Sequence, residues 1–134
     1  MPISPALRER VLRRAAFACE YCLVHERFAT FTSQVDHVIA KKHGGTDHFE
    51  NLANSCVQCN RFKGSDIASI DAESGELVPL FNPRMQTWNE HFRLDGFVIV
   101  PLTSIGRATV NLLQLNQIDR LLLRQELLAQ GKYP

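Results

Sequence analysis

The sequence predicts a small α+β protein, because strand patterns and helix patterns alternate along a chain of 134 residues. In the centre, a strand, a polar loop, a second strand and a short helix are expected in succession. Helix patterns occupy both ends of the chain, and a hairpin pattern precedes the last of them. A chain of this length buries roughly two-thirds of its surface on folding, which is enough for one modest core. Residues 1–134 are therefore expected to form a single domain.

The N-terminal segment, residues 1–18, is predicted to be helical from Ser4-Pro5 to about Ala16. Serine is a favoured N-cap, and proline is favoured at the first helical position. The segment has no uninterrupted apolar stretch long enough for a signal peptide, which favours a cytoplasmic protein. Its arginines either lie against nucleic acid or form a solvated helix face: Arg8, Arg10, Arg13 and Arg14.

The central segment, residues 19–64, carries the order strand, loop, strand, helix. Its first strand is "FATFTSQVDHVIA", which is rich in β-branched and aromatic residues, and the polar, glycine-bearing "HGGTDHFEN" forms the loop. "LANSC" is short enough for a returning strand. "VQCNRFKGSD" then forms a short helix, for which Gly64 is the expected C-terminal glycine.

The C-terminal segment, residues 65–134, is predicted to support the central one. Its expected elements are a short strand around 77–81, a brief helix from "FNPR" through Trp88, a hairpin at Asp95-Gly96, and a helix from Ser104, broken near Asn116, that stops by Gly131. Charged residues interrupt the leucine-rich stretch 112–128 well short of the ~18 apolar residues of a membrane helix. This last helix either packs on the central segment or builds a homodimer.

Four cysteines form two C-x-x-C pairs, Cys19 with Cys22 and Cys56 with Cys59, and none is left over. A C-x-x-C turn brings two thiolates to one ion, and two such turns complete the tetrahedral coordination of zinc. Disulfides are rare in a reducing cytosol, and buried free thiols or a redox pair are the remaining alternatives. The sequence therefore predicts a structural Zn²⁺ site.

The two cysteine pairs are separated by 33 residues, more than the ~15–20 of a simple zinc ribbon. The gap holds an acid–histidine pair, Asp36-His37, followed by two lysines, two glycines and Asn51-Leu52. An isolated acid–histidine pair is most often an ion pair at a strand end. Because zinc would join the two ends of this segment, we interpret the whole segment as one functional unit.

These residues resemble the HNH endonuclease family, whose active site has the ββα-metal fold. The shared pattern is C-x-x-C, Asp-His before an aliphatic residue, Gly-Gly, Asn-Leu, C-x-x-C-Asn and Lys, and it runs from Cys19 to Lys63, about a third of the chain. Two positions depart from it. Asn60 stands where other members have histidine, a variant that the family tolerates, and Ala40 stands where many members have proline. Neither departure removes a catalytic group.

The resemblance implies a metal-dependent phosphodiester hydrolase. Asp36 and Asn60 are expected to hold a catalytic Mg²⁺ or Mn²⁺ through oxygen atoms, which such ions prefer. His37 is expected to be the general base, because histidine side chains are largely neutral at pH 7 and accept a proton from water. Consecutive side chains of a regular strand point to opposite faces, so the strand is predicted to end, bend or bulge at this pair. Asn51 is expected to pin the loop and orient His37.

The expected partner is nucleic acid, with double-stranded DNA as the first choice. Fifteen Lys and Arg stand against fourteen Asp and Glu, so the composition excludes a strong global field and leaves only local patches. His43 is a reserve candidate for contact with phosphate or metal. Four basic residues either contact phosphate or are solvated charges: Lys41, Lys42, Arg61 and Lys63.

A non-catalytic alternative stays open, in which the chain is a zinc-stapled module that binds nucleic acid or a protein without cutting it. The two interpretations differ at Asp36-His37. A binding module has no use for a base aligned with an oxygen-lined metal site.

Overall fold

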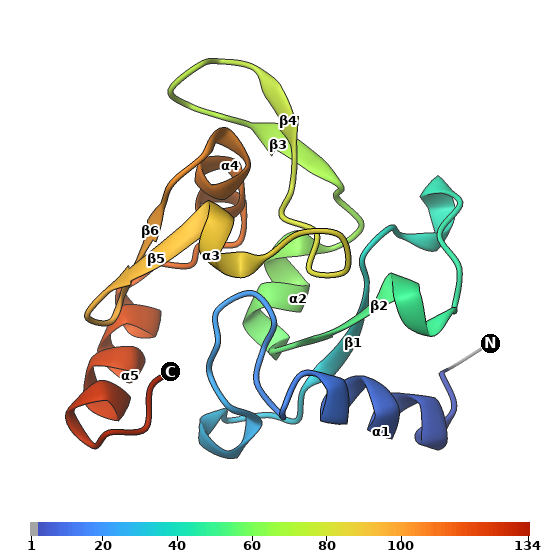
Figure 1. Cartoon of the computed structure of the whole chain (residues 1–134), viewed down its shortest axis with the longest axis horizontal. Helices are drawn as coiled ribbons and strands as arrows, with labels where there is room; N and C mark the ends of the chain where they lie inside the picture. The colour runs from blue at the N-terminus through green and yellow to red at the C-terminus, as the bar shows by residue number, and fades with distance from the viewer. Residues whose placement is uncertain (1–2) are drawn as a thin grey trace.

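The computed structural model describes residues 3–134 and has the predicted α+β architecture. Met1 and Pro2, which begin the predicted N-terminal segment, lie outside the described residues. Within residues 3–134 the strands form three separate antiparallel pairs. Helix α2 lies between the N-terminal elements and the C-terminal elements, as Figure 1 shows. The α-helices are α1 (Pro5–Arg14), α2 (Val57–Lys63), α3 (Trp88–His91), α4 (Ser104–Leu112) and α5 (Ile118–Ala129).

Helix α1 begins as the sequence predicts. The side chain of Ser4 accepts a hydrogen bond from the backbone N–H of Leu7 at 3.1 Å, and Pro5 is the first helical residue. The helix ends at Arg14, before the expected Ala16, because Ala16 itself takes a positive φ of 51°. A residue in that region of φ cannot continue a right-handed helix. The chain thus turns sharply into the first cysteine pair.

The central unit consists of β1 (Gln34–His37), β2 (Leu52–Ser55) and α2. Asp36 pairs with Ala53 and His37 with Leu52, so β1 ends at the acid–histidine pair, as predicted. Helix α2 also ends as predicted: its last residue is Lys63, and the Gly64 that follows has a φ of 53°. The expected ββα arrangement is therefore present.

The first strand is shorter than the predicted 28–40. Residues 26–28 form a 3₁₀ turn, and residues 29–33 have no strand partner. The physical reason is the length of the partner: β2 offers only four residues before Cys56 caps α2. A strand cannot extend beyond the backbone groups available to pair with it.

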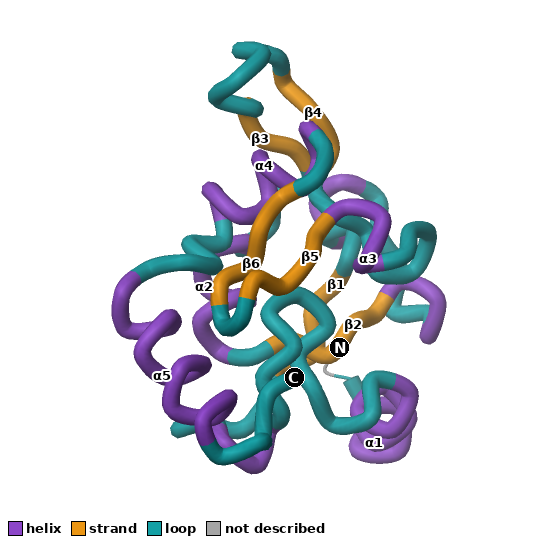
Figure 2. Tube along the Cα trace, turned by 60° about the vertical axis from the view of Figure 1, so that its left-hand side comes forward, coloured by secondary structure: helices purple, strands orange, loops and turns teal. Residues whose placement is uncertain are grey.

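The C-terminal segment contains two hairpins. One joins β3 (Ala68–Ile70) to β4 (Leu77–Pro79) and projects from the body in both views (Figures 1 and 2). The sequence predicted β4 but not β3. The other joins β5 (Phe92–Asp95) to β6 (Val98–Pro101), which is the hairpin that the Asp95-Gly96 turn predicted.

The helical predictions in this segment are right for its end and wrong for its middle. The expected break near Asn116 separates α4 from α5. The brief helix expected from Phe81 through Trp88 is displaced, since α3 begins at Trp88. The side chain of Asn82 accepts hydrogen bonds from the backbone N–H groups of Arg84 and Met85, which makes a turn instead of a helix there.

The core connects the cysteine pairs to the C-terminal segment. Cys19, Cys22 and Cys59 belong to the same buried cluster as Phe81, Phe92, Ile99, Leu113, Leu115, Leu127 and Tyr133. The C-terminal segment therefore packs against the central unit rather than standing apart from it. Across residues 3–134, no helix combines the length and the apolar character that crossing a membrane requires.

Candidate active site and its zinc support

The four cysteines converge at the base of the ββα unit. Their sulfur atoms all lie within 4.8 Å of one another, and Cys22 Sγ is 3.8 Å from Cys56 Sγ. A zinc ion held by four thiolates at about 2.3 Å places neighbouring sulfur atoms about 3.8 Å apart. None of the four cysteines forms a disulfide. The donor set and its spacing therefore fit a structural zinc ion, as predicted.

Residues of the C-terminal segment close around this cluster. Arg120 of α5 donates to Cys59 Sγ at 2.8 Å and to the carbonyl oxygen of Leu113 at 2.7 Å. Burial lowers the pKa of Arg120, but the charges on the neighbouring cysteine sulfur atoms outweigh burial and raise it above its ordinary value. The hydroxyl of Tyr133 donates to the carbonyl oxygen of Cys22 at 2.7 Å. A guanidinium held here offsets the negative charge of a four-thiolate site.

Asp36 lies on the inner side of β1. Its carboxylate accepts a hydrogen bond from the Tyr21 hydroxyl at 2.6 Å and one from Lys63 Nζ at 3.2 Å, and its side chain is only 2% exposed. Burial raises the pKa of Asp36, and Lys63 and Tyr21 counteract part of that rise. Each carboxylate oxygen has two lone pairs, so these contacts fix the carboxylate without using its whole capacity to bind.

Lys63 was expected either to contact phosphate or to be a solvated charge, but the structure buries it. Its side chain is 2% exposed and sits between β1 and α2. Besides Asp36, the ammonium donates to the carbonyl oxygens of His37 and Val38, at 3.1 and 3.2 Å. All three of its protons are therefore engaged inside the protein. Because β1 ends at His37, two free carbonyl oxygens and a buried carboxylate attract the cation inward.

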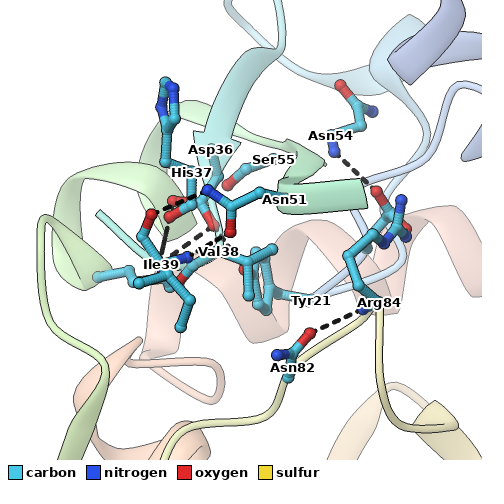
Figure 3. A network of polar contacts seen from close by, with 12 residues as sticks. Tyr21, Asp36, His37, Val38, Ile39, Asn51, Asn54, Ser55, Asn82 and Arg84 are labelled. Atoms are coloured by element: carbon cyan, nitrogen blue, oxygen red, sulfur yellow. Dashed lines mark hydrogen bonds and ion pairs between the residues drawn. The ribbon is translucent and has the colours of Figure 1, made fainter. Parts of the chain in front are cut away.

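His37 projects from the other side of the strand end, and its ring points away from Tyr21 (Figure 3). Its Nε2 lies 2.8 Å from Asp47 Oδ1, and the other oxygen of Asp47 lies 2.8 Å from Lys41 Nζ. The His37 side chain is 26% exposed. The imidazole is thus held at one nitrogen and open to solvent, and Lys41 is engaged in an ion pair.

Asn51 ties the loop between β1 and β2 to the end of β1. Its side-chain oxygen accepts from the backbone N–H of Ile39 at 3.0 Å, and its amide donates to the carbonyl oxygen of Ile39 at 3.0 Å (Figure 3). The same amide donates to the carbonyl oxygen of Thr46 at 2.8 Å. Gly45 fits closely beneath this network, since a Cβ there would lie 1.7 Å from the Ile39 carbonyl oxygen. The loop is therefore fixed on both sides of His37's partner Asp47.

One open cleft brings together the predicted base His37 and the predicted metal-binding residues Asp36 and Asn60, whereas Asn51 does not line it. Its volume is about 370 Å³, and it is lined by Val35, Asp36, His37, Ala40, Lys41, Asn60, Gly64 and Ser65. Among the described residues, none forms a hydrogen bond with the side-chain amide of Asn60. A carboxylate oxygen and a free amide oxygen on one cleft are a donor set that suits Mg²⁺ or Mn²⁺. Asp36 and His37 leave β1 on different sides and Asn60 belongs to α2, yet all three line the same cleft.

The remaining basic residues divide into two groups. Lys42 and Arg61 are exposed, as a phosphate contact requires, and the Arg61 guanidinium carbon lies 5.0 Å from the Phe62 ring centroid. The arginines of α1 instead serve packing in part: Arg10 and Arg14 lie over the ring of Phe49, at 4.3 and 3.7 Å. His43 is exposed and does not line the cleft.

Three residues with direct contacts to the site were not predicted. Tyr21 lies inside the first cysteine knuckle, so its position next to the ββα unit was available from the motif. Asp47 lies in the loop after the glycine pair, where an acid near a histidine is a weak signal. Arg120 interrupts an otherwise leucine-rich stretch. A charged residue on the apolar face of a helix indicates a buried partner, and here that partner is the cysteine cluster.

Two comparisons with known proteins give matches, one to the central part of the chain and one to most of it. Residues 19–66 match the family model described as HNH endonuclease. The Septu protein PtuB of Bacillus thuringiensis is 26% identical over 119 residues, which cover 87% of this chain and 44% of that protein. The chain therefore spans less than half the length of this curated relative. No solved structure matches the chain.

Proposed function

Because residues 19–66 match the HNH endonuclease family, we propose that this protein is a metal-dependent endonuclease that hydrolyses phosphodiester bonds in double-stranded DNA. The observation that carries the proposal is the shared cleft: Asp36, His37 and Asn60 line one space of about 370 Å³. A base and two oxygen donors must address the same phosphorus for hydrolysis to occur. Residues on unrelated surfaces would have been incompatible with this chemistry.

In the proposed mechanism, Asp36 and Asn60 hold the divalent cation through a carboxylate oxygen and an amide oxygen. When bound, the cation supplies positive charge near the scissile phosphate and the leaving oxygen. His37 takes a proton from the attacking water, a role typically worth about 10²–10⁴ in rate. Asn51 binds the backbone of Ile39 and Thr46, and this keeps the loop, and with it His37, in position at the cleft. Zinc would anchor the opposite end of the same unit.

Contact with DNA is proposed to occur mainly through the backbone. Lys42 and Arg61 are the candidates that remain exposed and without an ion pair among the described residues. Arg61 directly follows the proposed metal ligand Asn60 in α2 but does not line the cleft, so its phosphate contact is proposed beside the cleft. Phosphate contacts position a protein on a duplex but carry no base information. The affinity should accordingly fall steeply with salt and depend little on sequence.

The decisive experiment incubates supercoiled plasmid with the zinc-loaded protein and Mg²⁺ or Mn²⁺, and compares wild type with His37→Ala. We expect wild type to nick or linearise the plasmid and His37→Ala to lose about 10²–10⁴ of the rate. His48→Ala is the matched control, since His48 is an exposed histidine of the same loop whose side chain forms no hydrogen bond within residues 3–134. Cleavage that persists in His37→Ala would remove His37 from the role of base.

A second candidate is a zinc-stapled module that binds nucleic acid or a protein without cutting it. The observation that favours it is the engagement of the Asp36 carboxylate by Tyr21 and Lys63 in a nearly closed environment. Titration of Mn²⁺ into wild type and Asn60→Ala, followed by electron paramagnetic resonance, separates the two. A metal-dependent nuclease requires a Mn²⁺ site that weakens in Asn60→Ala. Folded, zinc-loaded protein that binds no Mn²⁺ and cuts neither DNA nor RNA supports the binding module.

A further inference from the structure

The loop between β1 and β2 presents an aspartate to the imidazole of His37. Asp47 Oδ1 lies 2.8 Å from His37 Nε2, and Asp47 Oδ2 lies 2.8 Å from Lys41 Nζ. The Asp47 carboxylate therefore contacts both the imidazole and the ammonium, and His37 and Lys41 both line the cleft. We propose that Asp47 is a positioning residue that holds the His37 ring with its proton on Nε2, so that Nδ1 is the atom that receives the proton from water. This inference rests on the proposed nuclease function.

The charge on Asp47 sets the direction of the hydrogen bond. The hydrogen bond from Lys41, and then that from His37, lower the pKa of Asp47, so the carboxylate is ionised at neutral pH. An ionised carboxylate only accepts hydrogen bonds. His37 Nε2 must therefore donate, and in a neutral imidazole the other nitrogen is then a bare acceptor.

The second nitrogen of the ring is free to act. Among the described residues, none forms a hydrogen bond with His37 Nδ1, and His37 lines the same cleft as the oxygen donors Asp36 and Asn60. When Nδ1 takes a proton from water, the ring becomes an imidazolium and the hydroxide remains to attack phosphorus. Asp47 keeps its negative charge and stabilises the imidazolium through the bond it already makes.

Asp47 is held firmly enough to have this effect. Its neighbour Thr46 is fixed through its carbonyl oxygen, which accepts from the Asn51 amide at 2.8 Å. Gly45 packs where a Cβ would collide with the Ile39 carbonyl oxygen. The role of Lys41 also changes: the ammonium expected to contact phosphate is the group that holds Asp47 in place. The loop therefore delivers a carboxylate to a set position beside the ring.

The state of the ring can be measured without any activity. Long-range ¹H–¹⁵N correlation spectra of histidine-labelled, zinc-loaded protein distinguish protonated from bare ring nitrogens, and His37→Gln assigns the His37 signals. We expect wild type near pH 8 to carry its proton on Nε2 with Nδ1 bare, and Asp47→Asn to gain the opposite tautomer. Glu50→Gln is the matched control, since it removes one charge from the same loop at a side chain with no hydrogen bond among the described residues. A wild-type ring that carries a proton on Nδ1, alone or together with one on Nε2, overturns the proposal.

Cleavage kinetics provide the second readout. Asp47→Asn is expected to lower kcat by about 10–100-fold with little change in KM, as loss of a supporting hydrogen bond typically does. Asp47→Glu should recover part of the loss, Glu50→Gln should behave as wild type, and Asp47→Asn in a His37→Ala background should cost nothing more. Full kcat in Asp47→Asn with an altered tautomer also overturns the role. If wild type cuts no nucleic acid, the nuclease proposal fails, while the spectra still decide the tautomer.

Discussion

Lys63 Nζ lies 3.2 Å from the carboxylate of Asp36, and both side chains are 2% exposed. This buried pair joins α2 to the end of β1, the two elements that carry the proposed metal ligands. The lysine also donates to the carbonyl oxygens of His37 and Val38. The same cation therefore fixes one of the proposed metal ligands and the backbone of the proposed base.

Replacing Lys63 with methionine should strongly destabilise the protein. The change leaves Asp36 buried without its cation, and breaking a buried ion pair in this way typically costs about 3–5 kcal/mol. Urea unfolding of the zinc-loaded protein measures the free energy of unfolding, with Lys42→Met as an exposed-lysine control. The double variant Asp36→Asn with Lys63→Met should recover part of the loss. A Lys63→Met protein as stable as wild type but weaker in DNA binding would restore the phosphate-contact assignment.

Zinc should be required for the folded state. Cys19→Ser removes one of the four sulfur ligands, and structural zinc contributes about 10–16 kcal/mol of apparent binding free energy in small zinc peptides. We expect one zinc ion per chain in wild type, and loss of both zinc and the cooperative thermal transition in Cys19→Ser. Elemental analysis and circular dichroism check the two parts. A cooperatively folded wild-type protein with four reactive thiols and no metal would contradict the assignment.

Arg120→Met tests how the C-terminal helix supports the zinc cluster. Methionine keeps an apolar side chain in place of the arginine stem, but it removes the hydrogen bonds to Cys59 Sγ and to the Leu113 carbonyl oxygen, and with them the positive charge beside the thiolates. Loss of such an outer contact typically weakens metal affinity by about 10–100-fold. Competition with a chromogenic chelator measures it. Arg93→Met provides the control, because Arg93 is exposed and makes no side-chain hydrogen bond among the described residues; equal zinc affinity in both variants would refute the role.

Asn51→Ala should loosen the loop that carries Asp47. It removes the hydrogen bonds to both backbone groups of Ile39 and to Thr46, and unpaired groups left partly buried cost about 1–3 kcal/mol. Hydrogen exchange should therefore quicken at the amide of Ile39, whose N–H the Asn51 oxygen accepts. The rate of DNA cleavage should decrease in the same variant. Unchanged exchange at Ile39 would show that the loop is held by other contacts.

The β3–β4 hairpin should lose an anchor in acid. The Asp71 carboxylate accepts two hydrogen bonds from Arg107, at 2.8 and 2.9 Å, and these bonds hold its pKa well below the ordinary range. Because the folded pKa is depressed, the ionised group stabilises the folded state above its unfolded pKa of about 4, and this contribution is lost as the pH falls through the lower folded pKa. Asp71→Asn should therefore be less stable than wild type at pH 7, with a gap that narrows below about pH 4. Thermal melts across this range, with exposed Asp66→Asn as control, measure the gap; a gap independent of pH would exclude the ion pair as its cause.

The sequence predicted the features that depend on residue type and short spacing. Two C-x-x-C turns indicated the sulfur cluster, Ser4-Pro5 the start of α1, Gly64 the end of α2, and Asp95-Gly96 the β5–β6 hairpin. Each of these depends on backbone conformation or ligand geometry within a few residues. The family pattern also identified Asp36, His37 and Asn60, which line one cleft in the structure.

Only the tertiary structure decided which partners the charged side chains have. Lys63 turns inward because the end of β1 leaves carbonyl oxygens free beside a buried carboxylate. Arg120 is buried because α5 packs on the cysteine cluster, although Arg120 and Cys59 are 61 residues apart in the sequence. Asp47 meets His37 only because Asn51 folds the loop back onto Ile39. A charge in a sequence has no fixed partner until packing brings one within hydrogen-bond distance. The candidate metal-binding residues could therefore be predicted from short stretches of sequence. The contacts that hold and orient their side chains depend on the assembled fold.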